Sequence, residues 1–211
     1  MEPELITQEF LNGQCFDKWL KEDGNDANKY FCNANDWNLP TAPFIVSDQI
    51  QDWKQVQHFI EQNINSFPFI KTCDLSPKDW KNPPCFDTVE SAMEALQNST
   101  RTKYFLNKKC RHVIMKQKRN YTSQSRCFWN GDRLRVSIGN MSKNLVLKFF
   151  EIYQYSIPFH YCCIELGEFE NGKVELIEIN SFGLTCGPDP LDWSQNWHEL
   201  LFTKEPIFIV L

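Results

Sequence analysis

The sequence predicts an α+β fold in which short strands, mostly in antiparallel pairs, alternate with single helices. Two dipeptides that favour tight turns, Asn130-Gly131 and Asn171-Gly172, each separate two β-favouring segments and so predict two hairpins. Between the strands, apolar residues recur three or four positions apart, which is typical of helices that pack one face. At 211 residues, the chain is long enough for one domain or for two closely fused lobes.

The first hundred residues predict two strands and two or three helices. The run 44–46 is β-favouring and predicts a strand, and the apolar residues of 51–65 recur at helical spacing. A second apolar strand ends at Lys71. The segment 76–79, Ser-Pro-Lys-Asp, then predicts a helix start, because serine is a good N-cap and proline suits the first helical position. Another helix is expected over 88–98.

The rest of the chain predicts five strands, two helices and an apolar tail. The strands are expected at 112–117, 126–129, 133–138, 159–166 and 173–180, the helices at 142–155 and 194–201, and the tail at 207–211. Residues 1–42 are acidic and rich in asparagine, and they receive no fold assignment beyond one short amphipathic candidate, 10–20.

The composition excludes several classes of protein. A net charge of −5 argues against non-specific nucleic-acid binding, which needs a basic surface. No segment approaches the roughly 20 apolar residues of a membrane span, and the first 20 residues carry acids where a signal peptide is basic and then apolar. The nine cysteines include no Cys-x-x-Cys pair, so we expect reduced thiols in a soluble, cytoplasmic protein. P-loop, dinucleotide-binding and nucleophile-elbow motifs are absent from the sequence.

The most informative segment is the late strand 173–180, which ends in Glu178-Ile179-Asn180. Side chains two positions apart on a strand share a face, so Glu178 and Asn180 lie about 6.5–7 Å apart along it. A carboxylate beside an amide oxygen suits Mg²⁺, a hard cation that is often held by a few protein oxygens together with substrate phosphates. An edge strand with solvated acids explains this segment equally well when it is taken alone.

Two lysines at strand ends are candidates for phosphate binding. Lys71 follows a short apolar strand, and a lysine near free backbone N–H groups can hold phosphates, although most such lysines are simply solvated. Lys116 lies at the end of an apolar run, where an unpaired ammonium group is costly, and this favours a functional interpretation. Lys118 and Arg119 just beyond it are more simply explained as a solvated loop.

Taken together, these segments resemble the ATP-grasp superfamily and, within it, the cell division cycle 123 family. The similar motifs follow in the family's order at Lys71 with 76–79, 113–117, 125–129, 176–183, 189–191 and 197–201. The matched order spans about residues 43–201. The sequence departs from the family pattern at three places: Gln124-Ser125 stand where an acid precedes the arginine, Glu178 replaces an aspartate, and Ser181 replaces a proline.

The resemblance implies a two-lobed ATP-grasp-like domain over 43–211, with the phosphate lysines in lobe 43–120 and a metal site in lobe 121–211. Nucleotide phosphates would be bound by Lys71, Lys116 and Arg126, and the hinge beside the adenine would be Gln117-Lys118. Mg²⁺ would be bound by Glu165, Glu178 and Asn180, with Glu165 on the strand antiparallel to the last one. No catalytic residue is assigned.

By the same resemblance, the protein would bind ATP and Mg²⁺ and serve as an assembly chaperone for the translation initiation factor 2 complex, with a subunit of that factor as its protein partner. The alternative is an ATP-grasp ligase or kinase that transfers a phosphoryl group to a carboxylate or protein acceptor. A third alternative is a relic that binds no nucleotide, which the intact Lys71, Lys116, Glu178 and Asn180 disfavour. The sequence leaves open whether ATP is hydrolysed. It predicts no direct nucleic-acid or membrane partner.

Overall fold

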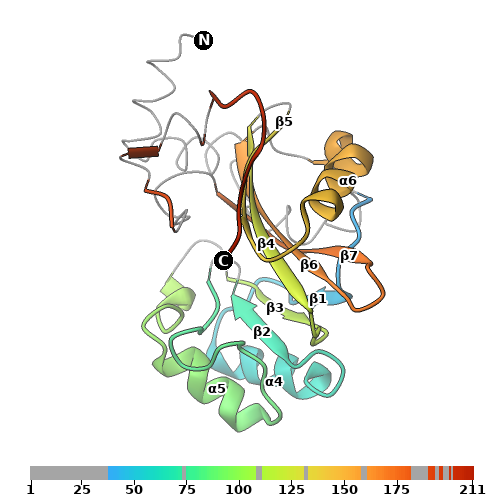
Figure 1. The fold of residues 1–211 in the computed structure, drawn as a ribbon. Coiled ribbons are helices and arrows are strands. Elements are labelled where there is room, and N and C mark those ends of the chain that lie inside the picture. Colours follow the sequence, from blue (N-terminus) through green and yellow to red (C-terminus); the bar gives the residue numbers. More distant parts are fainter. Residues whose placement is uncertain are drawn as a thin grey trace. The chain divides into compact units, whose positions relative to one another are not determined.

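The computed structural model describes residues 38–72, 75–107, 111–130, 133–157, 161–181, 190–192, 195–196, 200 and 202–211. This part of the chain divides into two compact units (Figure 1). The smaller unit contains residues 42–119, and the larger contains residues 120–211 together with 38–41.

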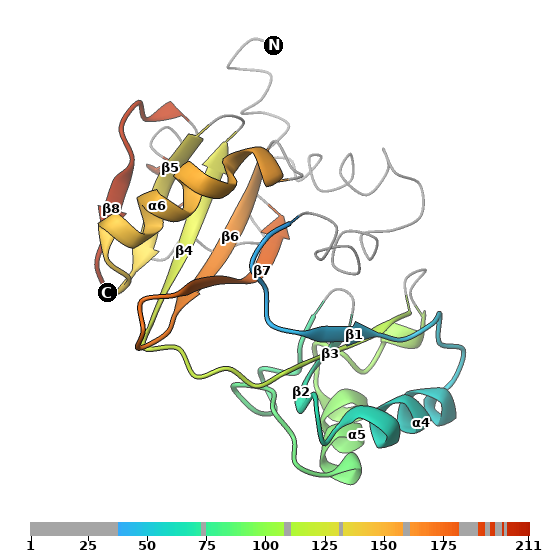
Figure 2. The ribbon, with the colours of Figure 1, turned by 90° about the vertical axis from the view of Figure 1, so that its right-hand side faces the viewer.

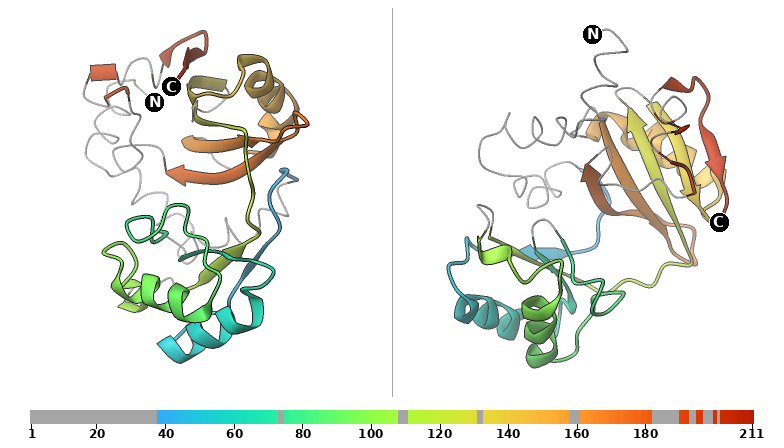
Figure 3. Two further views of the ribbon diagram at one scale, coloured as in Figure 1. Left: turned by 60° about the horizontal axis from the view of Figure 1, so that its bottom comes forward. Right: turned by 90° about the vertical axis from the view of Figure 1, so that its left-hand side faces the viewer.

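The smaller unit is a three-stranded antiparallel sheet with helices on one face (Figure 3). Its strand order is β1-β3-β2, with β1 at Phe44–Val46, β2 at Phe69–Thr72 and β3 at Val113–Lys116. The helices are α4 (Trp53–Asn63), α5 (Val89–Asn98) and the short 3-10 helix η1 (Phe105–Asn107).

Local sequence signals explain where these helices begin. The side chain of Asp52 accepts a hydrogen bond from the Gln55 N–H at the start of α4, and Thr88 does the same for the Ser91 N–H at the start of α5. The apolar faces of the two helices meet the sheet in one core, which includes Val56, Ile60, Ile70, Phe86, Ala92, Ala95, Leu96, Phe105, Val113 and Met115. The helices therefore cover the face of the sheet on which Ile70 and Met115 lie.

The larger unit contains a five-stranded sheet with the order β7-β6-β4-β5-β8. Its strands are β4 (Ser123–Asn130), β5 (Arg133–Gly139), β6 (Tyr161–Glu168), β7 (Val174–Ser181) and β8 (Ile207–Ile209). All neighbouring strands are antiparallel except β8, which runs parallel to β5. The helix α6 (Lys143–Tyr153), which η2 (Gln154–Ser156) extends, lies across one face of this sheet (Figure 2).

The helix-covered face of the larger sheet is apolar. Val146, Phe149 and Phe150 of α6 share a core with residues from β4, β5, β6 and β7. The rings of Trp129 and Phe150 stack with their centroids 5.2 Å apart. Burial of such a helix face against a sheet supplies the main stabilisation of this unit. The opposite face is partly covered by a second cluster of Phe128, Val136, Ile138, Cys163 and Leu200.

A β-bulge in β7 decides which of its side chains face α6. Leu166 pairs with Leu176 and Glu165 pairs with Glu178, so Ile177 is the extra residue of β7. Leu176 belongs to the core beneath α6, and one residue is inserted before Glu178. Residues two positions apart on a regular strand share a face, and Leu176 faces α6. Because of the bulge, Glu178 lies instead on the face away from α6.

Most of the predicted elements are confirmed, with ends that move by one to three residues. The hairpin through Asn171-Gly172 is present, and Gly172 has a φ of 74°, which favours glycine. β4 and β5 pair as expected, while their turn at 131–132 lies outside the described residues, as do 1–37 and most of 194–201. No helix in the described ranges has the length and apolar character needed to cross a membrane.

The helix predicted to start at 76–79 is wrong. Residues 78–80 form a turn, in which the Trp80 and Lys81 N–H groups bond the Pro77 carbonyl oxygen, and no helix follows. Asp79 does not cap this segment, because its carboxylate bonds Ser99 and Thr100 at the end of α5. Two prolines at 83 and 84 also follow closely and oppose helix continuation.

The cysteines that the structure describes form no disulfide. Cys85, Cys127, Cys162 and Cys163 are all buried thiols. Burial raises the pKa of Cys127 to about 12 and also raises that of Cys85, so both thiols stay protonated near neutral pH. These four residues agree with the expectation of reduced cysteines.

Candidate functional site

The two candidate phosphate lysines lie on the same face of the smaller sheet. Lys71 on β2 is directly opposite Ile114 on β3, and Lys116 is two positions further along β3. Diagonal neighbours of this kind have their Cβ atoms about 7 Å apart. Both side chains lie on the face away from α4 and α5, because Ile70 and Met115 occupy the helix-covered face. The structure thus brings Lys71 and Lys116 together.

The two lysines differ in exposure. Lys71 is 3% exposed, whereas Lys116 at the end of its strand is partly exposed. A buried ammonium group has lost most of its hydration, so an anion near it gains more than an anion near a solvated lysine. Lys71 is therefore the more sheltered of the two candidate positions.

The predicted hinge residues Gln117 and Lys118 follow β3 directly. The Gln117 N–H donates to the Pro43 carbonyl oxygen at 3.0 Å, which extends the pairing of β1 and β3 by one bond. A nucleobase at this hinge would have to use other backbone groups than that N–H. Lys118 is exposed and Gln117 is partly exposed.

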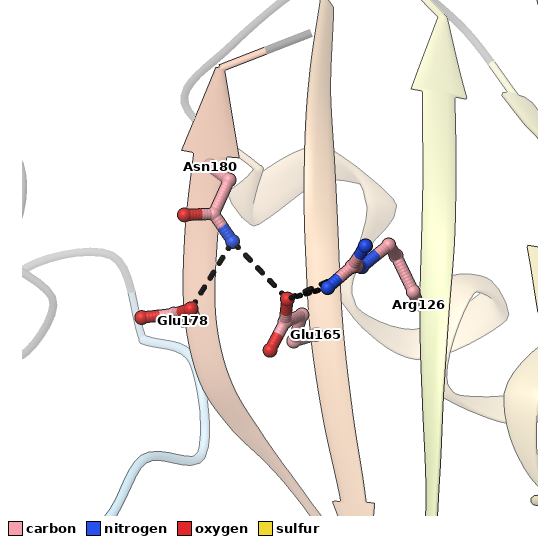
Figure 4. A network of polar contacts seen from close by, with 4 residues as sticks. All are labelled: Arg126, Glu165, Glu178 and Asn180. Carbon is pink, nitrogen blue, oxygen red and sulfur yellow. Dashed lines mark hydrogen bonds and ion pairs between the residues drawn. The ribbon is translucent and has the colours of Figure 1, made fainter. Parts of the chain in front are cut away.

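The larger sheet presents a row of charged side chains on the face away from α6. Arg126 on β4 is directly opposite Glu165 on β6, and Glu165 is directly opposite Glu178 on β7. The Arg126 guanidinium forms an ion pair with Glu165, with Nη2 and Oε1 3.0 Å apart (Figure 4). The Nε of Arg126 lies 3.3 Å from the same oxygen. The register of β4 against β6 therefore places the positive side chain of Arg126 beside the two paired acids.

Asn180 connects the two acids. Its Nδ2 donates to Glu165 Oε1 at 3.4 Å and to Glu178 Oε1 at 3.3 Å (Figure 4). One amide nitrogen therefore lies within hydrogen-bonding distance of an oxygen from each carboxylate. The structure brings together all four residues predicted for this unit, namely Arg126, Glu165, Glu178 and Asn180.

The donor set of this cluster fits a hard divalent cation. Two carboxylates directly opposite each other on antiparallel strands repel, so a cation between them would relieve that repulsion. The Asn180 amide now presents its nitrogen, and rotation about its terminal torsion would present its oxygen. Within the described ranges, no group of three or more His, Cys, Asp or Glu side chains could hold a metal ion, and this cluster offers two carboxylates and one amide.

A second carboxylate of β7 has a different environment. Glu175 is 2% exposed and accepts a hydrogen bond from the Tyr121 hydroxyl at 2.7 Å. The Tyr121 ring lies against Gly167, where an added Cβ would be 2.4 Å from a ring carbon. This pair could not be predicted from the sequence, because Gly167 stands opposite Glu175 only through the register of β6 against β7.

Two other acids also have structural partners. Glu168 is the last residue of β6, and its carboxylate accepts a hydrogen bond from the Ser123 hydroxyl. Asp79 accepts hydrogen bonds from the Ser99 hydroxyl and from the N–H and hydroxyl of Thr100. These bonds lower the pKa of Asp79 from 3.8 to about 2, with the Ser99 bond contributing most.

The sequence matches no protein-family model and no curated protein. Solved structures resemble its fold. The structure of Cdc123 from Schizosaccharomyces pombe is 14% identical with a TM-score of 0.62, and the match covers 89% of this chain and 94% of that one. A C-terminally truncated Cdc123 from the same organism is 15% identical with a TM-score of 0.61, covering 88% and 94%.

A weaker likeness is to the ATP-grasp ligase PsnB complexed with minimal precursor, Mg and ADP. It is 11% identical with a TM-score of 0.44, and the match covers 81% of this chain and 55% of that one. The likeness to Cdc123 carries the fold assignment. The predicted resemblance to the cell division cycle 123 family is thus confirmed as a likeness of fold, and the elements of the structure confirm the α+β class.

Proposed function

We propose that this protein binds ATP together with Mg²⁺ and acts as an assembly chaperone for the translation initiation factor 2 complex. In this proposal Lys71, Lys116 and Arg126 bind phosphate oxygens, while Gln117 and Lys118 border the adenine. Glu165, Glu178 and Asn180 bind the metal. The observation that carries the proposal is the convergence of Arg126, two acids and an amide on one face of the larger sheet.

The residue chemistry supports nucleotide binding. Lysine and arginine offer donors to phosphate oxygens, and the carboxylates beside Arg126 supply the oxygen ligands that Mg²⁺ prefers. Two acids that bound no cation would destabilise the sheet when they lie directly opposite each other, and would be better tolerated at solvated positions. When bound, Mg²⁺ would neutralise phosphate charge, and the chain's own residues would orient the polyphosphate.

Isothermal titration calorimetry tests the nucleotide part of the proposal. ATP and ADP are titrated into the protein with Mg²⁺ and again with EDTA. We expect saturable binding that is stronger with Mg²⁺. Absence of binding under both conditions would refute this part.

The chaperone part needs a different experiment. Purified subunits of translation initiation factor 2 are mixed with the protein, with and without ATP and Mg²⁺, and the mixtures are separated by size-exclusion chromatography. We expect co-elution with one subunit. A cytoplasmic location belongs to the same proposal, and it is supported by the buried thiols of the described cysteines, which form no disulfide.

The same samples distinguish chaperone from enzyme. A ligase or kinase releases ADP or transfers phosphate when a carboxylate or protein acceptor is present, whereas a binding protein leaves ATP intact. Release of ADP is measured with and without the initiation factor subunits. Turnover that needs an acceptor other than these subunits would replace the chaperone proposal with the ligase or kinase alternative.

A further inference from the structure

One oxygen of Glu165 is the centre of the polar cluster in the larger sheet. Its Oε1 lies 3.0 Å from Arg126 Nη2, 3.3 Å from Arg126 Nε and 3.4 Å from Asn180 Nδ2. Each of these three nitrogen atoms is an N–H donor. A metal ion at this oxygen would compete with these donors, because donor hydrogens and a cation use the same lone pairs.

The two members of the ion pair differ in exposure. The Arg126 side chain is 38% exposed, whereas that of Glu165 is 16% exposed. A dissolved anion can therefore reach the guanidinium more readily than a dissolved cation can reach the carboxylate. A phosphate group would also offer Arg126 two oxygens in the geometry that its planar fork matches.

We propose that Arg126 makes metal binding depend on nucleotide binding. Without nucleotide, its ion pair with Glu165 lowers the affinity of the acids for a free divalent cation. Phosphate oxygens of the nucleotide draw the guanidinium away from Glu165, and the released carboxylate joins Glu178 and Asn180 around the metal that arrives with the phosphates. This inference rests on the proposed function, because it assigns an order of events to the same site.

The coupling must be reciprocal. If nucleotide raises the affinity for metal by releasing Glu165, then metal raises the affinity for nucleotide by the same factor. Arg126 is therefore a positioning residue for the metal site as well as a phosphate contact. Its removal has opposite effects on the two ligands: phosphate binding weakens, and binding of the metal alone becomes stronger.

The test measures metal alone, without nucleotide. Mn²⁺ replaces Mg²⁺, and the fraction of free Mn²⁺ is followed by electron paramagnetic resonance as protein is added. Arg126→Gln removes the charge, and we expect it to bind Mn²⁺ about tenfold more tightly than the unmodified protein. Damage to the fold would not produce a gain in affinity.

The control is a second arginine of the same sheet. Arg133→Gln changes the net charge equally but alters an exposed residue of β5 opposite Asn130. Its Mn²⁺ affinity should equal that of the unmodified protein. Circular dichroism checks that each variant is folded, and if Arg126→Gln does not fold, Arg126→Lys takes its place with a smaller expected gain, because lysine lacks the planar fork.

Equal Mn²⁺ affinity of Arg126→Gln and the unmodified protein would overturn the inference. So would equal gains in Arg126→Gln and Arg133→Gln, since these would reflect net charge alone. Failure of the proposed function gives a separate result, because the unmodified protein would then bind no ATP in calorimetry. This result does not depend on the Mn²⁺ affinities.

Discussion

Glu165 and Glu178 lie directly opposite each other on β6 and β7, so two carboxylates share one level of an antiparallel ladder. Like charges in this arrangement destabilise a sheet. Asn180 donates a hydrogen bond to each acid, and Arg126 pairs with Glu165, which relieves part of the repulsion. Local arrangements that cost stability in this way are typical of sites whose purpose is binding.

The first prediction concerns Glu178, the proposed metal ligand on β7. Glu178→Gln removes one of the two repelling charges, so the protein without ligands should be equally stable or more stable. The dependence of ATP binding on Mg²⁺ should largely disappear, because an amide is a weaker ligand than a carboxylate. Thermal unfolding without ligands and calorimetry with Mg²⁺ or EDTA measure the two effects.

The control for this variant is another glutamate of the same strand. Glu175 is buried and accepts a hydrogen bond from Tyr121, so Glu175→Leu, which removes the acceptor, should cost about 1–3 kcal/mol of unfolding free energy. Its Mg²⁺ dependence should stay unchanged. If Glu178→Gln unfolds easily while its Mg²⁺ dependence persists, Glu178 has a structural role and the metal assignment fails.

The second prediction concerns phosphate binding by Lys116. Lys116→Gln removes the charge and keeps most of the side-chain length, so ATP binding should weaken by about 1.5–3 kcal/mol. Stability without ligands should change little, since Lys116 is partly exposed. Lys54→Gln, at an exposed position of α4, is the matched control and should bind ATP normally. Unaltered ATP affinity in Lys116→Gln would refute the assignment.

The sequence predicted the elements of this fold well because their signals are local. Helix α4 has an aspartate N-cap and an apolar stripe, and β6 and β7 meet at an Asn-Gly turn. The shared face of Glu178 and Asn180 followed from strand periodicity alone. These features need no knowledge of distant parts of the chain.

Features that depend on pairing between distant strands could not be predicted. The ion pair of Arg126 with Glu165 follows from the register of β4 against β6, which the sequence does not state. The bulge at Ile177 likewise appears only when β7 is paired with β6. At 76–79, a plausible helix start gave way because Asp79 found partners 20 and 21 residues later.

The third prediction is a pH dependence that arises from Asp79. Its pKa is about 2 in the folded protein, below its usual 3.8, because Ser99 and Thr100 donate hydrogen bonds to the carboxylate. The ionised group therefore favours the folded state above about pH 4, and this contribution is lost as pH falls toward 2. Asp79→Asn should be less stable than the unmodified protein at pH 7.

Urea unfolding at several pH values checks this prediction. The difference in unfolding free energy between the two proteins should narrow steadily between pH 4 and the lowest pH at which both still fold. A difference that stays constant with pH would show that the charge of Asp79 has no part in the effect.

The fourth prediction tests the packing of Tyr121 on Gly167. An added Cβ at Gly167 would lie 2.4 Å from the Tyr121 ring, so Gly167→Ala must displace the ring and with it the hydroxyl that bonds the buried Glu175. We expect a loss of about 1–3 kcal/mol in unfolding free energy, typical of overpacking.

Tyr121→Phe removes the same hydrogen bond without moving the ring. The two substitutions disturb one contact, so urea unfolding of the double variant should show less than the sum of the single losses. Full additivity, or unchanged stability of Gly167→Ala, would mean that ring placement and the Glu175 bond are independent.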